Sequence, residues 1–117
     1  MVIYSKHLSE PWFSLVLLGI KTVEGRLNKG SFAQMVVGDI IEFKNDDVGI
    51  MRSCKVEIQK ITKHRTFADL LQEQNLQQCL PGIGNIENGI RVYYSYYTPV
   101  DESKFGVLSF DLKIKQD

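Results

Sequence analysis

The sequence is poor in the residues and patterns that define several large classes of protein. It contains two cysteines, Cys54 and Cys79, which are far apart and lack the spacing of metal ligands. We interpret both as buried, reduced thiols, which are typical of a reducing compartment. The two histidines, His7 and His64, are also far apart and have no partner in a metal-binding pattern. We therefore expect no metal ion and no other cofactor.

Other absences narrow the cellular location and the class of partner. No apolar run approaches the length of a transmembrane helix. The N-terminal residues, in which Lys6 and His7 are soon followed by Glu10, do not resemble a secretory signal. We therefore expect a cytoplasmic protein that does not contact a membrane. Basic and acidic residues number 14 each, so no net charge attracts the protein to nucleic acid or to anionic lipid.

The chain has the size and composition of one globular domain. Its 117 residues support one hydrophobic core, and the hydrophobic share of 44% is ordinary for such a domain. No repeat, low-complexity tract or linker divides the sequence. We therefore predict a single domain over residues 1–117 and expect it to be a monomer.

The pattern of apolar residues predicts a mixed order of strands and helices. Ser9 and Pro11 are typical of a helix start, Gly19 is typical of a helix end, and Thr66 is expected to cap a later helix. Pro99 is expected to end the last helix. Strands are predicted over 1–7, 22–27, 40–44, 49–62 and 105–114, and helices over 11–18, 67–74, 75–79 and 85–97. These elements predict an α+β fold, a small barrel of about five to six mixed strands with three to four peripheral helices.

The most informative segment is the run GIKTVEGRL over residues 19–27. If it forms a strand, period-two alternation places Thr22, Glu24 and Arg26 on one face. Lys21 then lies at the turn before the strand, and two cations and a carboxylate meet at one edge of the sheet. This edge could hold a small polar ligand. The alternative is an ordinary surface strand, whose Glu-Arg ion pair contributes little.

This segment resembles the signature of a known family. The pattern GxKxxExR, formed here by Gly19, Lys21, Glu24 and Arg26, resembles that of ASCH domains. The resemblance implies a PUA-like β-barrel with a cleft between the motif strand and neighbouring helices, and it implies binding of RNA or a role in nucleotide-related processes. Similar segments cover nearly the whole chain and include Pro11-Trp12-Phe13, Gly38-Asp39, Tyr93-Tyr94-Ser95-Tyr96-Tyr97 and Gly106-Val107-Leu108.

One branch of the family that this chain resembles hydrolyses the acetyl amide of N4-acetylcytidine with a Lys, a Thr and a Glu. The Lys corresponds to Lys21, but Glu24 occupies the position of the Thr. The position of the Glu falls near Glu73 or Gln74, and the best register places it on Gln74. The chain thus departs from this branch at one or two positions, and its candidate catalytic residues are Lys21 and Glu24.

We predict recognition of RNA or of a modified nucleoside as the leading function. A protonated Lys21 and the forked guanidinium of Arg26 suit a phosphate or a base edge, and Glu24 can accept from an exocyclic amino group. Unpaired bases also stack on aromatic rings. The remaining candidate ligand-binding residues are Thr22, Trp12 and Tyr97, with Tyr93, Tyr94 and Tyr96 as alternative rings.

Two other functions stay open on the sequence alone. The first is an amidohydrolase that removes an acyl group from a modified base such as N4-acetylcytidine, with Lys21 catalytic. The second is a protein-interaction module in a transcription- or translation-linked complex. Binding requires Arg26 and an aromatic ring without turnover, whereas hydrolysis requires Lys21 and must release a product. An interaction module should tolerate both Lys21→Ala and Arg26→Ala.

Overall fold

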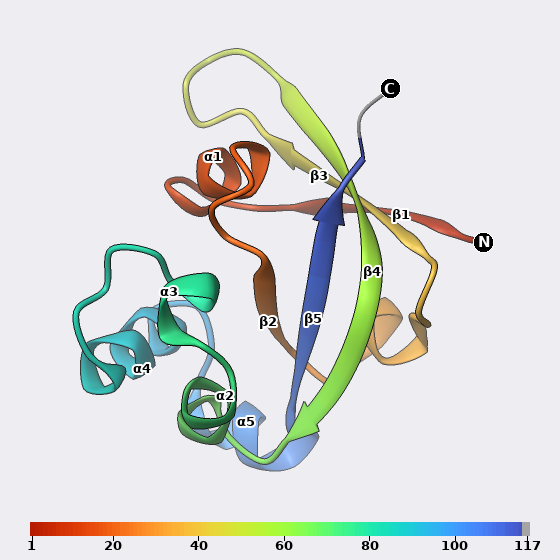
Figure 1. Ribbon diagram of the computed structural model, residues 1–117. Helices are drawn as coiled ribbons and strands as arrows, with labels where there is room; N and C mark the ends of the chain where they lie inside the picture. The colour runs from red at the N-terminus through yellow and green to blue at the C-terminus, as the bar shows by residue number, and fades with distance from the viewer. Residues whose placement is uncertain (116–117) are drawn as a thin grey trace.

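A curled sheet of five strands forms the centre of the molecule, and helices pack against it (Figure 1). The computed structural model describes residues 1–115. The strands are β1 (Ile3–His7), β2 (Val23–Leu27), β3 (Ile40–Asn45), β4 (Arg52–His64) and β5 (Val107–Ile114). The helices are α1 (Trp12–Leu17), the 3-10 helix η1 (Gly30–Gln34), α2 (Phe67–Glu73), α3 (Leu76–Cys79), α4 (Ile86–Tyr94) and α5 (Pro99–Phe105).

The strand order β1-β3-β4-β5-β2 leaves β1 and β2 as the edges of the sheet. β1 pairs in parallel with β3, and the other neighbours pair antiparallel. The sheet curls until its two edges meet. The guanidinium of Arg26 in β2 donates a hydrogen bond to the carbonyl of His7 at the end of β1 (3.0 Å). A mixed, curled sheet with peripheral helices confirms the predicted α+β class.

The helices differ from the prediction at two prolines. Pro99 does not end the helix before it but begins α5, where its missing N–H leaves no bond unmade. The Thr98 side chain caps α5 by accepting from the N–H of Asp101 (3.1 Å). Residues 1–115 therefore contain five α-helices, not three or four. At α1 the cap position is Pro11, and Ser9 instead bonds Tyr96 through its hydroxyl.

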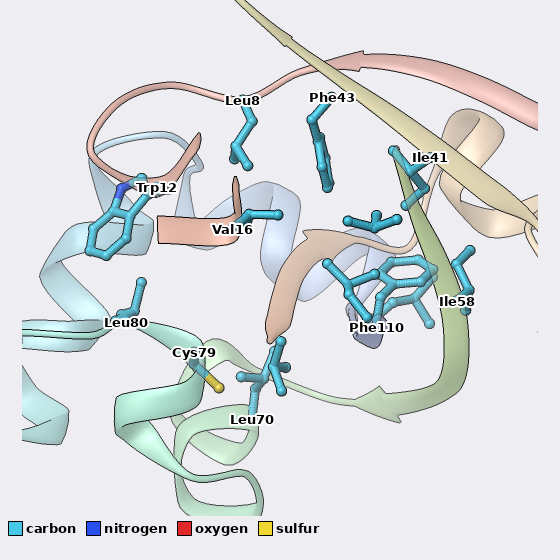
Figure 2. Packing of buried hydrophobic residues seen from close by; sticks show 14 of the residues in the cluster. Leu8, Trp12, Val16, Ile41, Phe43, Ile58, Leu70, Cys79, Leu80 and Phe110 are labelled. Atoms are coloured by element: carbon cyan, nitrogen blue, oxygen red, sulfur yellow. The ribbon is translucent and has the colours of Figure 1, made fainter. Parts of the chain in front are cut away.

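Both faces of β2 and β5 are covered, so β2 is not an ordinary surface strand. On the inner face, the ring of Phe110 lies 5.7 Å from that of Phe32, and Figure 2 shows it beside Ile58 and Ile41. On the outer face lie α2 and α4, so close that a Cβ added to Gly25 would be 3.1 Å from Leu70 Cδ1. The motif strand is thus enclosed between the barrel interior and the helices.

A polar cluster around the buried side chains of His64 and Ser109 fixes α2 to the sheet. The imidazole of His64 contacts Ser109 Oγ through Nε2 (2.8 Å) and the carboxylate of Glu73 through Nδ1. The side chain of Gln74 donates to the same Ser109 hydroxyl (3.2 Å). Thr66 caps α2, as predicted, by accepting from the N–H of Asp69. Glu73 and Gln74 are therefore both engaged in holding α2 in place.

Glu102 joins three helices, and its removal should destabilise the fold. Its carboxylate accepts from the N–H of Phe67 and from the hydroxyl of Tyr94, both at 2.7 Å. In Glu102→Ala the buried N–H of Phe67 loses its partner, so the free energy of unfolding should fall by about 1–3 kcal/mol. Urea unfolding followed by circular dichroism measures this change. Glu87→Ala, which removes an exposed partner of Arg91, should have little effect; equal losses would contradict the prediction.

Candidate functional site

A cavity of about 200 Å³ lies at the free edge of β2, between the segment leading into α1 and helix α4. Pockets for drug-sized ligands measure about 300–1,000 Å³, so this one has room for a single small ring system. Its polar walls come from the motif, and its aromatic walls come from α1, from α4 and from the segment that follows α4. The polar lining residues of the motif are Lys21, Glu24 and Arg26, and the aromatic lining residues are Trp12, Tyr93, Tyr96 and Tyr97.

Lys21 is buried at the base of the cavity with 2% of its surface exposed. Its Nζ donates to the carbonyl of Val23 (2.6 Å) and to that of Cys79, and it lies 3.3 Å from Oε1 of Glu24. An ammonium group has three N–H donors, and these three acceptors match them. The surroundings of Lys21 therefore suit a charged ammonium that holds other groups in place.

Glu24 is held between two cations and is 5% exposed. Its Oε2 accepts from Nε of Arg26 at 2.9 Å, while Oε1 faces Lys21. Burial is the strongest influence and by itself would raise the pKa of Glu24. The charges and hydrogen bonds of Arg26 and Lys21 together outweigh it, so the pKa falls below the usual 4.5. Glu24 is thus an ionised carboxylate that can only accept hydrogen bonds.

The structure shows which of the candidate tyrosines line the cavity. Tyr93, Tyr96 and Tyr97 line the cavity, whereas the hydroxyl of Tyr94 points away to Glu102. The rings of Tyr93 and Tyr97 stack on Phe67, with centroids 4.3 and 5.3 Å away. Among residues 1–115 the buried hydroxyl of Tyr93 has no hydrogen-bond partner. Burial also raises the pKa of Tyr93 well above its usual range, so this hydroxyl keeps its proton.

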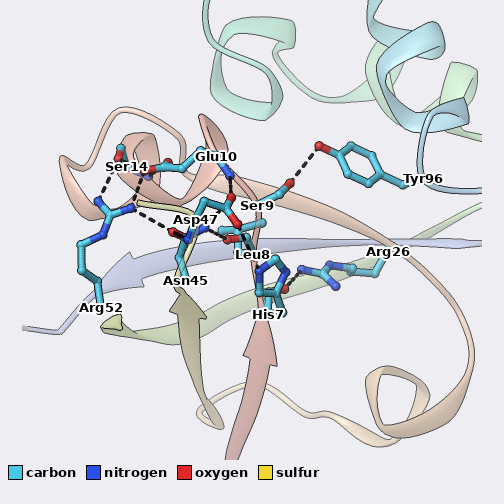
Figure 3. A network of polar contacts seen from close by, with 10 residues as sticks. All are labelled: His7, Leu8, Ser9, Glu10, Ser14, Arg26, Asn45, Asp47, Arg52 and Tyr96. Atoms are coloured by element: carbon cyan, nitrogen blue, oxygen red, sulfur yellow. Dashed lines mark hydrogen bonds and ion pairs between the residues drawn. The ribbon is translucent and has the colours of Figure 1, made fainter. Parts of the chain in front are cut away.

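A second network fixes the segment between β1 and α1, which forms the opposite wall (Figure 3). The guanidinium of Arg52 donates to the side chains of Glu10 (2.6 Å) and Asn45 (2.9 Å), and Asn45 donates to the carbonyl of Leu8. At the mouth of the cavity, the hydroxyl of Ser9 lies 2.8 Å from that of Tyr96. This contact joins the wall near α1 to the wall near α4.

The structure brings together most of the predicted site residues, but not all. Lys21, Glu24, Arg26, Trp12 and Tyr97 meet at the cavity. Thr22 lies outside it, and its backbone pairs with Gln78 and with Leu112. Gly25 and Tyr93 also line the cavity, although the sequence pointed to Tyr93 only as an alternative ring and did not point to Gly25. A glycine within a strand pattern is a signal for close backbone approach, and it could have identified Gly25.

An exposed group of possible metal ligands lies near the rim, although the sequence predicts no metal site. His7, Asp46 and Asp47 each bring one ligand atom within 4.8 Å of the others. Asp47 already accepts hydrogen bonds from the N–H of Glu10 (3.0 Å) and from the amide of Asn45 (2.9 Å). These bonds explain its position without an ion.

The curled mixed sheet with a cavity beside one edge strand defines a small PUA-like barrel domain. A family model for the ASCH domain matches residues 7–114, and the chain belongs to this family. The structure is similar to the crystal structure of hypothetical protein PH0355, with 30% identity, a TM-score of 0.87 and coverage of 97% of this chain and 100% of that one.

Two further solved structures are similar. The solution NMR structure of protein PF0455 from Pyrococcus furiosus has 29% identity, a TM-score of 0.79 and coverage of 99% of this chain and 100% of that chain. A mutant of ZmASCH from Zymomonas mobilis has 14% identity, a TM-score of 0.66 and coverage of 95% and 67%, and it supports the fold alone. No curated protein matches the chain. Within residues 1–115, no helix has the length and apolar character needed to cross a membrane.

Glu24→Gln should lower stability in a pH-dependent way. The substitution removes the anion from a buried charge cluster, so the free energy of unfolding at neutral pH should fall by about 3–5 kcal/mol. Because the folded-state pKa of Glu24 is depressed, its contribution is complete above the usual pKa of 4.5 and is lost as the pH falls through the folded-state value. The gap between wild type and variant should therefore narrow in acid.

Urea unfolding at a series of pH values measures this gap. Glu57→Gln is the matched control, because its carboxylate lies at the surface, 3.6 Å from Lys115, and should show a small gap at every pH. A gap for Glu24→Gln that stays constant from neutral to acidic pH would refute the assignment of Glu24 as the buried anion.

Proposed function

We propose that this ASCH domain binds a single unpaired base of RNA, or a free modified nucleoside, in the cavity beside β2. The observation that carries the proposal is the combination of four aromatic rings with an ionised carboxylate around about 200 Å³. Stacking on an aromatic side chain contributes about 1–3 kcal/mol per base. The resemblance of ASCH domains to RNA-binding PUA-like domains supports the same class of ligand.

In this proposal the three motif residues have different roles. Glu24 is the acceptor for an N–H group of the base, and Lys21 and Arg26 hold its carboxylate in place. A carboxylate has about four acceptor sites, and the two cations leave some of them for a ligand. Trp12 and Tyr97 are the candidate stacking rings. We expect this function in a cytoplasmic monomer.

Hydrolysis of an acylated base has less support. Lys21 would have to act as base or nucleophile, but its ammonium already donates to two carbonyls and faces Glu24. The catalytic Glu of the hydrolysing branch falls near Glu73 or Gln74, with Gln74 as the best register. Gln74 bonds Ser109, and Glu73 contacts His64. We therefore prefer recognition without turnover. A role as a protein-interaction module has no specific contact in its favour.

Ligand binding should be visible in the fluorescence of Trp12. This residue is the only tryptophan of the chain and lines the cavity, so entry of a base should quench or shift its emission. Nucleosides and short single-stranded RNA should give saturable curves, and a duplex of the same sequence should bind more weakly because its bases are paired. Failure of every nucleoside and single strand to give saturation would sink the proposal.

Tyr97→Leu should weaken this binding about tenfold or more, because it removes one stacking ring while keeping bulk. The matched control is Tyr4→Leu, which removes a half-buried tyrosine ring away from the cavity and should leave the affinity unchanged. Equal affinities for wild type and Tyr97→Leu would exclude a stacking role for this ring.

The same protein should not hydrolyse N4-acetylcytidine. Incubation at high protein concentration, followed by chromatography, should show no release of cytidine beyond the rate without protein. Release by wild type together with its loss in Lys21→Ala would instead establish an amidohydrolase in which Glu24 replaces the expected Thr.

A further inference from the structure

β2 is an edge strand, so the backbone N–H and C=O groups of every second residue point away from β5 and toward the side on which the cavity lies. In an antiparallel pair, every second residue bonds its partner, and the residues between point their N–H and C=O outward. The N–H of Leu112 donates to the carbonyl of Thr22 (2.8 Å), and the N–H of Asn28 donates to the carbonyl of Gly106 (3.0 Å). The backbone groups of the even-numbered residues of β2 therefore bond β5. The N–H and C=O of Gly25 point the other way, toward the free edge of the sheet.

Gly25 differs from the two outward residues that flank it. The carbonyl of Val23 accepts from Nζ of Lys21 (2.6 Å), and that of Leu27 accepts from the N–H of Lys29 (2.9 Å). Gly25 lines the cavity, and no turn or loop backbone within residues 1–115 bonds its N–H or C=O. The N–H of Gly25 is thus a free donor, and its C=O is a free acceptor. Both are available to a ligand in the cavity.

The hydroxyl of Tyr93 lies beside this backbone. A Cβ added to Gly25 would be 3.1 Å from the hydroxyl oxygen and 3.2 Å from the adjoining ring carbon. Tyr93 is 4% exposed, and its hydroxyl has no partner within the described residues. A buried hydroxyl without a partner is unfavourable, and a ligand that lines up with Gly25 would supply the missing bond. Only a residue without a side chain lets the ring approach this closely.

We propose that the main chain of Gly25 and the hydroxyl of Tyr93 together read one edge of the ligand. The N–H donates and the C=O accepts, so the ligand presents an acceptor next to a donor on a planar edge, as bases do on their pairing edge. The Tyr93 hydroxyl donates to the same edge. This inference rests on the proposed function and narrows it to bases whose pairing edge is free and unsubstituted, with any modification elsewhere on the ring.

The first test compares ligands. Of the four common nucleosides, the one that binds best by Trp12 fluorescence is compared with its methylated derivatives. A methyl group on the pairing edge (position 3 of a pyrimidine, position 1 of a purine) should weaken binding at least about tenfold, or about 1.4 kcal/mol. A methyl group away from that edge (position 5 or position 8) should change affinity by less than about threefold, which is under 1 kcal/mol.

The second test uses a pair of neighbouring tyrosines. Tyr93→Phe removes the hydroxyl without a partner, so the affinity should fall about tenfold while the stability of the free protein stays the same or rises. Tyr94→Phe is the matched control on the same helix. Its hydroxyl donates to Glu102 (2.7 Å) outside the cavity, so stability should fall while the affinity stays unchanged. A purely structural role of Tyr93 would lower its stability instead.

The outcomes separate this inference from the function on which it rests. If the derivative methylated on the pairing edge binds as tightly as the parent nucleoside, or if Tyr93→Phe binds normally, edge reading by these groups is wrong while base binding stands. If no nucleoside and no single-stranded RNA binds, the proposed function fails and the inference fails with it.

Discussion

The buried charge cluster of Lys21, Glu24 and Arg26 is the constraint on which the rest of the structure depends. Removal of three charges from water costs several kcal/mol per ion unless each gains close partners. The cluster meets this condition through the Glu24 carboxylate and through backbone carbonyls in β2, at the end of α3 and at the end of β1. Within residues 1–115 no backbone pairing joins β1 to β2, so the guanidinium of Arg26 supplies the link that closes the barrel.

The same cluster unites the two interpretations of the motif, an ion pair that fixes a strand and a site that holds a ligand. Its cations contact protein acceptors, and its anion, Glu24, both pairs with these cations and lines the cavity. In the proposed function, Lys21 therefore holds Glu24 in place, and Glu24 is the residue that meets the ligand. β2 is enclosed between the barrel interior and helices α2 and α4, and four of its five residues are buried.

Local signals were sufficient for most of the elements. Alternation located the motif strand and the closing strand, and the side chain of Thr66 caps α2 as its residue type predicts. Proline is the exception, because the missing N–H that ends one helix equally suits the first turn of the next. Pro99 thus begins α5, and the choice depended on the docking of Glu102 against α2 and α4.

The sequence by itself determined the family, the motif strand and the residue types of the site, because these follow from spacing and period. Only the tertiary structure decided which groups face the cavity. The outward orientation of Gly25 depends on the register between β2 and β5, which is set by residues far away in the chain. The choice of Tyr93 over Tyr94 depends on how α4 packs against Phe67 and α5. Both outcomes depend on strand pairing and side-chain packing between residues far apart in the chain, so no local sequence pattern predicts them.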